Sequence, residues 1–194
     1  MTNELEIVAA VFGVISVFLS VRQNIWSWPT AIVNVGLYSV VFYHSRLYAD
    51  MGLQVVYVVL SVYGWYQWLY GGKNRTELPV TRTTPKVAAI LFGAVLISTM
   101  LIGTFLHRGT DAALPYIDST TTSVSLAAQW MMTRKLLENW LVWVAVDIVY
   151  IWMFINRSLY VTAGLYAVFL VLSATGWFQW RQSRSAAEAA PAIP

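Results

Sequence analysis

Residues 138–154 read ENWLVWVAVDIVYIWMF, and this stretch decides what kind of fold the chain adopts. It is long and apolar enough to cross a bilayer as a helix, which needs about 20 residues. Its polar and aromatic residues share one helical face, because they follow one another at steps of three or four: Asn139, Trp143, Asp147, Tyr150 and Phe154. The pattern predicts a transmembrane helix with one face toward lipid or other helices. The other face points toward hydrogen-bond partners and flat rings.

Asp147 lies near the middle of this predicted span. An ionised carboxylate at that depth costs about 2.5 kcal/mol or more, so it marks a functional site by default. Two alternatives remain open at this point. A hydroxyl or indole N–H of a neighbouring helix would hold the acid in a structural role, and the aromatic stripe would then be packing or a membrane-interface belt. Because the acid, the amide and the rings share one face, the pattern favours a binding site.

The composition is that of a polytopic membrane protein. The 194 residues are 58% hydrophobic and only 11% charged, and the mean hydropathy is +0.61. A soluble domain carries about 25% charged residues. The chain has no cysteine, and it shows no phosphate-binding loop, nucleophile motif or metal-ligand spacing. We therefore expect no enzyme activity, metal or cofactor. The small positive charge is spread over loops and does not indicate nucleic-acid binding.

Seven apolar runs are predicted to span the membrane. The fifth is rich in hydroxyl groups, so it is expected to face the interior and not lipid. The N-terminus is acidic, and the first run is therefore expected to be a retained helix and not a cleaved signal peptide. The spans are expected at 5–21, 28–44, 51–71, 87–106, 117–133, 139–155 and 159–180.

The basic residues predict the orientation. Alternate loops divide them into two groups: Arg22, Lys73, Arg75, Arg82, Lys86, Arg134, Lys135, Arg181 and Arg184 on one side, and Arg46, Arg108 and Arg157 on the other. The positive-inside rule then puts the C-terminus in the cytoplasm and the N-terminus outside. The polar tail 181–194 has no apolar period and is expected to be a disordered cytoplasmic tail.

The sequence also repeats itself. Trp28–Trp68 aligns with Trp140–Trp180 without a gap and with 15 identities in 41 positions. The alignment ends by placing GWYQW (64–68) on GWFQW (176–180). Shared apolar composition does not produce two such blocks in one register. The first predicted span falls on the fifth in the same register.

The repeat predicts an all-α membrane protein of seven transmembrane helices arranged 3+1+3. Two parallel three-helix repeats, 5–71 and 117–180, are joined by a linker helix at 87–106, which restores the orientation of the second triple. Sugar transporters of the SWEET type use this arrangement, with the substrate near the membrane midplane between the halves.

Candidate substrate-binding residues lie on the polar faces of both halves. The complete predicted set is Asn34, Tyr38, Gln67, Thr121, Ser125, Gln129, Asn139, Trp140, Trp143, Asp147 and Tyr150. Trp26 and Trp28, at the mouth of a span, are expected to be interface anchors instead. A second group of tryptophans near span ends has the composition of an interface belt: Trp65, Trp68, Trp177 and Trp180.

The chain resembles the PnuC-type nicotinamide riboside transporters. In the second half, the resemblance is carried by DSTTTSVSLAAQWMMTRKLLENWLVWVAVDIVYIWMF (118–154) and SLYVTAGLYAVFLVLSATGWFQW (158–180). In the first half, it is carried by WSWPTAIVNVGLYSVVFYHSRLYADMGLQVVY (26–57) and YGWYQW (63–68). The combination AQW, RK, ENWLVW and a following Asp is specific, whereas the linker span and the tail contribute little.

The resemblance implies a facilitator in the bacterial inner membrane, with a SWEET-like fold that is associated with trimers. Such carriers equilibrate nicotinamide riboside, which a cytoplasmic kinase then phosphorylates and traps for NAD synthesis. Relatives of the same fold carry thiamine or riboflavin, so these substrates stay open as alternatives. A sugar carrier, a membrane enzyme and an accessory subunit are the remaining alternatives. No Lys or Arg is predicted in mid-membrane, which argues against a phosphorylated substrate.

Overall fold

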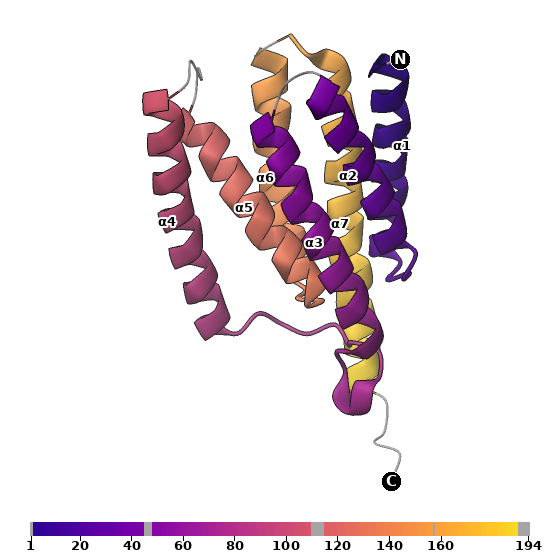
Figure 1. Ribbon diagram of the computed structural model, residues 1–194. Coiled ribbons are helices and arrows are strands. Elements are labelled where there is room, and N and C mark those ends of the chain that lie inside the picture. Colours follow the sequence, from indigo (N-terminus) through magenta and orange to yellow (C-terminus); the bar gives the residue numbers. More distant parts are fainter. Residues whose placement is uncertain (1, 45–47, 110–114, 157, 190–194) are drawn as a thin grey trace.

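The computed structural model describes residues 2–44, 48–109, 115–156 and 158–189, and these residues form a bundle of seven α-helices (Figure 1). The helices are α1 (Thr2–Val21), α2 (Ser27–His44), α3 (Tyr48–Tyr70), α4 (Pro85–Gly109), α5 (Pro115–Thr133), α6 (Asn139–Asn156) and α7 (Tyr160–Ala189), with a short 3-10 helix η1 (Lys73–Arg75) after α3. Each predicted span corresponds to one of the seven helices.

The predicted disordered tail is wrong for residues 181–189, because α7 continues to Ala189. Arg, Ala and Glu in this stretch are strong helix formers, so a helix already started in the bundle extends through them. The rest of the predicted tail, residues 190–194, lies outside the described residues.

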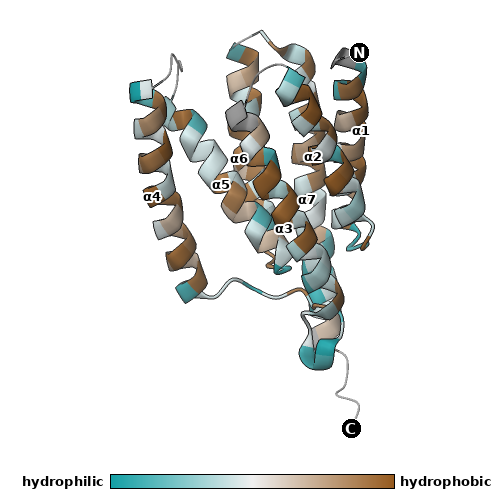
Figure 2. Ribbon diagram, in the orientation of Figure 1, coloured by the Kyte–Doolittle hydropathy of each residue, from teal (hydrophilic) through white to brown (hydrophobic). Residues whose placement is uncertain are grey.

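Four of the described helices are long and apolar enough to cross a membrane: α1 over Glu4–Val21, α4, α6, and α7 over Tyr160–Ala187. The other three carry more polar residues. In α5 the polar residues are turned inward, and Ser119, Thr121, Ser123 and Ser125 are all buried. The expectation that this helix faces the interior is therefore confirmed. Figure 2 shows hydrophilic residues gathered around η1, below the apolar helices.

The helices of the two halves pack in corresponding ways. Within the halves, α2 contacts α1 and α3, while α6 contacts α5 and α7. Between these groups, α1 packs on α7 and α3 packs on α5. α4 packs on α5 at the side of the bundle (Figure 1). The connectors 22–26, 71–84 and 134–138 all lie at one end of the bundle, which we call the connector end (Figure 1).

Four tryptophans form the core at the connector end. Trp28 meets Trp68 edge to face with ring centroids 5.2 Å apart, Trp68 meets Trp180 at 5.8 Å, and Trp180 meets Trp140 at 5.3 Å. Such edge contacts add about 0.5–1.5 kcal/mol each beyond the buried area. In the register of the sequence repeat, Trp28 matches Trp140 and Trp68 matches Trp180. The row of rings therefore has the symmetry of that repeat.

Hydrogen bonds between the halves follow the same symmetry. The indole Nε1 of Trp68 donates to the Met132 carbonyl oxygen at 3.0 Å, and the Nε1 of Trp180 donates to the Ser20 carbonyl oxygen at 3.0 Å. The two acceptor residues match each other in the same register. Trp68 and Trp180 are 2% and 0% exposed. The assignment of these two residues to an interface belt is therefore wrong, and they tie α3 to α5 and α7 to α1.

The two motif glycines explain how these rings pack so closely. A Cβ on Gly64 would overlap the Trp28 ring, and a Cβ on Gly176 would overlap the Trp140 ring. Only glycine leaves room for an indole directly against the helix backbone at these positions. In each half, the shared GW(Y/F)QW block therefore supplies a glycine against which an indole packs and a second, buried indole that donates a hydrogen bond.

The connector between η1 and α4 crosses this tryptophan core. Leu78 and Val80 are 9% and 8% exposed and belong to the same buried cluster. The backbone N–H of Leu78 donates to the Trp68 carbonyl oxygen at 3.1 Å. Thr81 forms a parallel bridge with Leu136, in the connector between α5 and α6.

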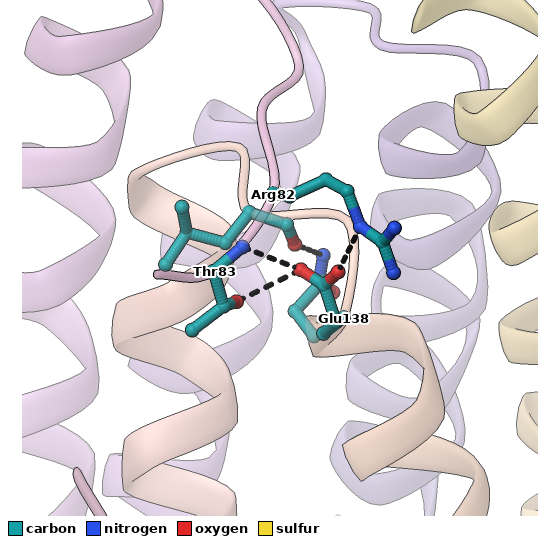
Figure 3. A network of polar contacts seen from close by, with 5 residues as sticks. Arg82, Thr83 and Glu138 are labelled. Carbon is teal, nitrogen blue, oxygen red and sulfur yellow. Dashed lines mark hydrogen bonds and ion pairs between the residues drawn. The ribbon is translucent and has the colours of Figure 1, made fainter. Parts of the chain in front are cut away.

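Glu138 fastens the same connector from the other side (Figure 3). Its carboxylate accepts hydrogen bonds from the Thr83 backbone N–H at 2.7 Å, the Thr83 hydroxyl at 2.8 Å and the Arg82 Nε at 3.0 Å. Partial burial alone would raise the pKa of Glu138, but these hydrogen bonds together hold its pKa below the ordinary value. The connector end is thus closed by backbone bridges, buried side chains and a charged anchor.

Candidate functional site

A cavity of about 600 Å³ lies inside the bundle above the tryptophan core. Its lining residues come from α1, α2, α3, α5, α6 and α7, so both halves of the sequence repeat contribute. The volume lies within the range of about 300–1,000 Å³ that is usual for small-molecule sites.

Most of the predicted site residues line this cavity. They are Asn34, Tyr38, Ser125, Gln129, Trp140, Trp143, Asp147 and Tyr150. They meet there because the polar faces of α2, α5 and α6 all turn toward the same space, as the steps of three and four along each helix require.

Three of the predicted residues are absent from the lining. Gln67 lies at the connector end of α3, where its Oε1 accepts a hydrogen bond from Arg134 at 3.0 Å. The Thr121 hydroxyl turns back onto its own helix and donates to the carbonyl oxygens of Ile117 and Asp118. Asn139 is fully buried at the start of α6, and its Nδ2 donates to the Leu136 carbonyl oxygen at 2.6 Å. Residue spacing along a helix does not reveal these hydrogen bonds, which range from contacts within one helix to a contact between α3 and a connector.

Asp147 is the acidic group of the cavity. Its side chain lines the cavity, the residue is 3% exposed, and Oδ2 accepts a hydrogen bond from the Ser173 hydroxyl at 3.1 Å. In the part of the chain that the structure describes, no ion pair involves Asp147. A buried carboxylate without a cationic partner makes the cavity a favourable place for a positive charge.

Aromatic rings of α6 and α7 form the wall of the cavity at the end away from the connector end. Tyr150 and Phe154 lie nearly parallel at 5.9 Å between ring centroids, and Tyr166 contacts them at 4.8 and 5.2 Å. Phe169 packs edge to face on Tyr166 at 5.7 Å. All four residues line the cavity. Trp28, Trp140 and Trp143 line it as well, so the lining contains aromatic residues from both halves.

Several lining residues were missed by the sequence reasoning. Ser27, Trp28, Tyr57, Ser61, Tyr166 and Ser173 all line the cavity. The prediction that Trp28 is an interface anchor is wrong, since this residue is 2% exposed, whereas Trp26 beside it is 65% exposed. The repeat carried the missing information: Trp28 matches Trp140, and Ser61 matches Ser173, the partner of Asp147.

The composition of the lining suits the binding of a small molecule. The described residues include no group of three His, Cys, Asp or Glu side chains that could hold a metal ion. The cavity instead combines flat rings, amides, hydroxyls and one carboxylate, which together suit a flat, cationic and polar molecule.

An all-α bundle with membrane-spanning helices and an internal polar–aromatic cavity defines a membrane transporter of small molecules. The chain belongs to the nicotinamide mononucleotide transporter family, whose model matches residues 3–182. The resemblance to the PnuC-type transporters is thereby confirmed.

The relatives support the same assignment. The nicotinamide riboside transporter PnuC of Escherichia coli (strain K12) is 27% identical over 92% of this chain and 85% of its own length. The riboflavin/roseoflavin transporter RibM of Streptomyces davaonensis is 24% identical, over 96% of this chain and 91% of its own. Among solved structures, the crystal structure of the vitamin B3 transporter PnuC matches with a TM-score of 0.72 and 27% identity, covering 95% of this chain and 83% of that one.

Proposed function

We propose that this protein carries nicotinamide riboside across the bacterial cytoplasmic membrane by facilitated diffusion, as a supply for NAD synthesis. The observation that carries the proposal is the Asp147 carboxylate, which forms no ion pair among the described residues and lies in a cavity walled by aromatic rings. Nicotinamide riboside joins a cationic pyridinium ring, a carboxamide and a ribose. Each tryptophan face contributes about 0.5–2 kcal/mol toward a flat cation, depending on desolvation.

The polar lining suits the other parts of this substrate. Gln129 and Asn34 offer amides and Ser125 a hydroxyl, which complement the carboxamide and the ribose. In this proposal Trp140, Trp143 and Tyr150 hold the ring, and Asp147 balances its charge. Gln67, Thr121 and Asn139 lie outside the lining and support it indirectly, through the hydrogen bonds that they make.

A phosphorylated substrate is disfavoured, although the family is named for the mononucleotide. Among the described residues that line the cavity, none is Lys or Arg. A phosphate dianion buried beside Asp147 without a basic partner would be strongly unfavourable. Asp147 is the one acidic side chain among the described lining residues, and a single acid is a limited basis for proton coupling. This favours facilitated diffusion over uptake driven by an ion gradient.

We also propose the 3+1+3 organisation, with repeats at 5–71 and 117–180 and a linker helix at 87–106. The paired packing of α1 on α7 and α3 on α5 supports it, as does the symmetry of the tryptophan core. The cavity between the repeats then forms the transport path, and the connector end faces the cytoplasm. The trimer implied by the family resemblance stays a prediction.

Riboflavin is the second candidate substrate, because the similar protein RibM is named as a riboflavin/roseoflavin transporter. Its ring system is flat but uncharged, so it would gain nothing from the Asp147 carboxylate. The two candidates therefore differ in their dependence on charge.

Titration of the purified protein with nicotinamide riboside, nicotinamide mononucleotide, thiamine and riboflavin tests the proposal. We expect saturable binding of the riboside and at least tenfold weaker binding of the mononucleotide. Equal affinity for the mononucleotide would contradict the argument from the missing basic residues. Tighter binding of riboflavin or thiamine would move the substrate to that vitamin.

A further inference from the structure

The two halves each begin their middle helix with a pair of residues that the repeat relates. α2 starts with Ser27 and Trp28, and α6 starts with Asn139 and Trp140. In the register of the repeat, the first pair falls on the second, residue for residue. The residues of both pairs are between 0% and 2% exposed.

All four residues carry a buried polar atom without a hydrogen-bond partner. These atoms are Ser27 Oγ, Trp28 Nε1, Asn139 Oδ1 and Trp140 Nε1. An unpaired buried donor or acceptor is unfavourable, and structures tolerate few of them. Three of the four belong to residues that line the cavity, which indicates groups kept for a ligand.

Both residues of the first-half pair line the cavity, whereas only Trp140 of the second-half pair does. Ser27, Trp28 and Trp140 all appear in its lining. The Trp28 ring is held against Gly64 as the Trp140 ring is held against Gly176, so neither indole can turn freely. The Ser27 carbonyl oxygen is already engaged by the Ser16 hydroxyl at 2.9 Å, which fixes the backbone beneath the unpaired hydroxyl.

The chemistry of the two pairs differs. Asn139 leaves its Oδ1 acceptor unpaired while its Nδ2 donates to the Leu136 carbonyl oxygen, and Trp140 leaves an unpaired donor. A serine hydroxyl both donates and accepts, so Ser27 with the Trp28 donor complements a sugar hydroxyl.

We propose that Ser27 and Trp28 form a ribose subsite on the α2 side of the cavity, across from Trp140 on the α6 side. The inference rests on the proposed function, because Asp147 and Trp143 on α6 draw the pyridinium ring to the second half. The ribose then lies toward α2, where one hydroxyl accepts from Trp28 Nε1 and donates to Ser27 Oγ.

The test compares two ligands on the full-length purified protein by isothermal titration calorimetry. Nicotinamide riboside has the ribose, and 1-methylnicotinamide has the same cationic ring without it. Trp28→Phe removes the N–H and keeps a ring on Gly64, and Ser27→Ala removes the hydroxyl. We expect each variant to weaken riboside binding about 5- to 10-fold, the worth of one hydrogen bond, and to leave 1-methylnicotinamide binding unchanged.

Trp26→Phe is the matched control, because Trp26 is 65% exposed and absent from the cavity lining; its riboside affinity should equal that of the unmodified protein. Equal losses for both ligands, or no loss for the riboside, would overturn the subsite. Thermal unfolding of each variant separates a binding loss from misfolding, and Ser27→Ala keeps the test valid if Trp28→Phe is unstable. Failure of the unmodified protein to bind the riboside would instead count against the proposed function itself.

Discussion

Replacing Asp147 by Asn isolates the charge of the proposed site. Asn has nearly the same size and keeps a side-chain carbonyl oxygen, which can still accept the hydrogen bond that the Ser173 hydroxyl makes at 3.1 Å. The packing around the residue is therefore largely conserved, and the main change is the loss of one negative charge from the cavity.

The magnitude follows from the burial of the carboxylate. Two unit charges about 5 Å apart attract by about 3 kcal/mol at an effective dielectric constant of about 20. Asp147 is 3% exposed and has no ion-pair partner among the described residues, so little of its charge is neutralised by the protein. The Ser173 hydroxyl and water in the cavity reduce the effect. We expect a loss of about 1.4–2.8 kcal/mol, which is 10- to 100-fold in affinity.

The assay is calorimetric titration of both proteins with two ligands. One is nicotinamide riboside, and the other is the uncharged C-nucleoside in which a carbon atom replaces the charged ring nitrogen. The Asp147→Asn variant should lose affinity for the cation only, so that the two ligands bind with similar strength. If both ligands lose affinity equally, or if neither does, Asp147 is a structural residue that holds α7 through Ser173, and the reasoning from charge is refuted.

The remaining predictions concern packing, the connector and the aromatic face. Gly176→Ala should destabilise the protein by about 1–3 kcal/mol in thermal unfolding, because its Cβ would overlap the indole seated there, whereas Gly164→Ala on the same helix has open space and should be neutral or slightly stabilising. Glu138→Gln should lower stability by about 1 kcal/mol at pH 7. The pKa of Glu138 is lower in the folded protein than in the unfolded chain, so the carboxylate stabilises the fold above its unfolded pKa of about 4.3, and this stabilisation is lost as the pH falls further. The difference in unfolding free energy between the variant and the unmodified protein should therefore disappear in acid. A difference that does not change with pH would contradict this. Trp143→Ala should weaken riboside binding by about 1–3 kcal/mol, whereas Val142→Ala, which is not in the cavity lining, should change it little; equal losses would mean that the aromatic stripe only packs.

Much of the fold was predictable because a bilayer allows few backbone conformations for a spanning segment. An apolar run of about 20 residues must be a helix, so seven runs predicted seven helices with small errors at their ends. The end of α7 was not predictable from hydropathy, because residues 181–189 are polar yet have high helix propensity. The bridge between Thr81 and Leu136 was also hidden, since it depends on how two connectors meet in space.

The cavity was predictable where helical spacing decides which way a side chain points. Asp147 and Tyr150 on α6 and Asn34 on α2 were found in this way, and all three line the cavity. Trp28 was missed because a tryptophan near a span end also fits an interface belt. Its burial depends on Gly64, which lies on another helix and becomes informative only once the two repeats are compared.

The most direct test of the central claim is uptake of labelled nicotinamide riboside into proteoliposomes that contain the purified protein and no kinase. We expect saturable entry that stops when the inside and outside concentrations are equal. Nicotinamide mononucleotide should not inhibit this entry. Accumulation above the outside concentration under a proton or sodium gradient would contradict facilitated diffusion. Absence of riboside entry would contradict the assignment of the substrate.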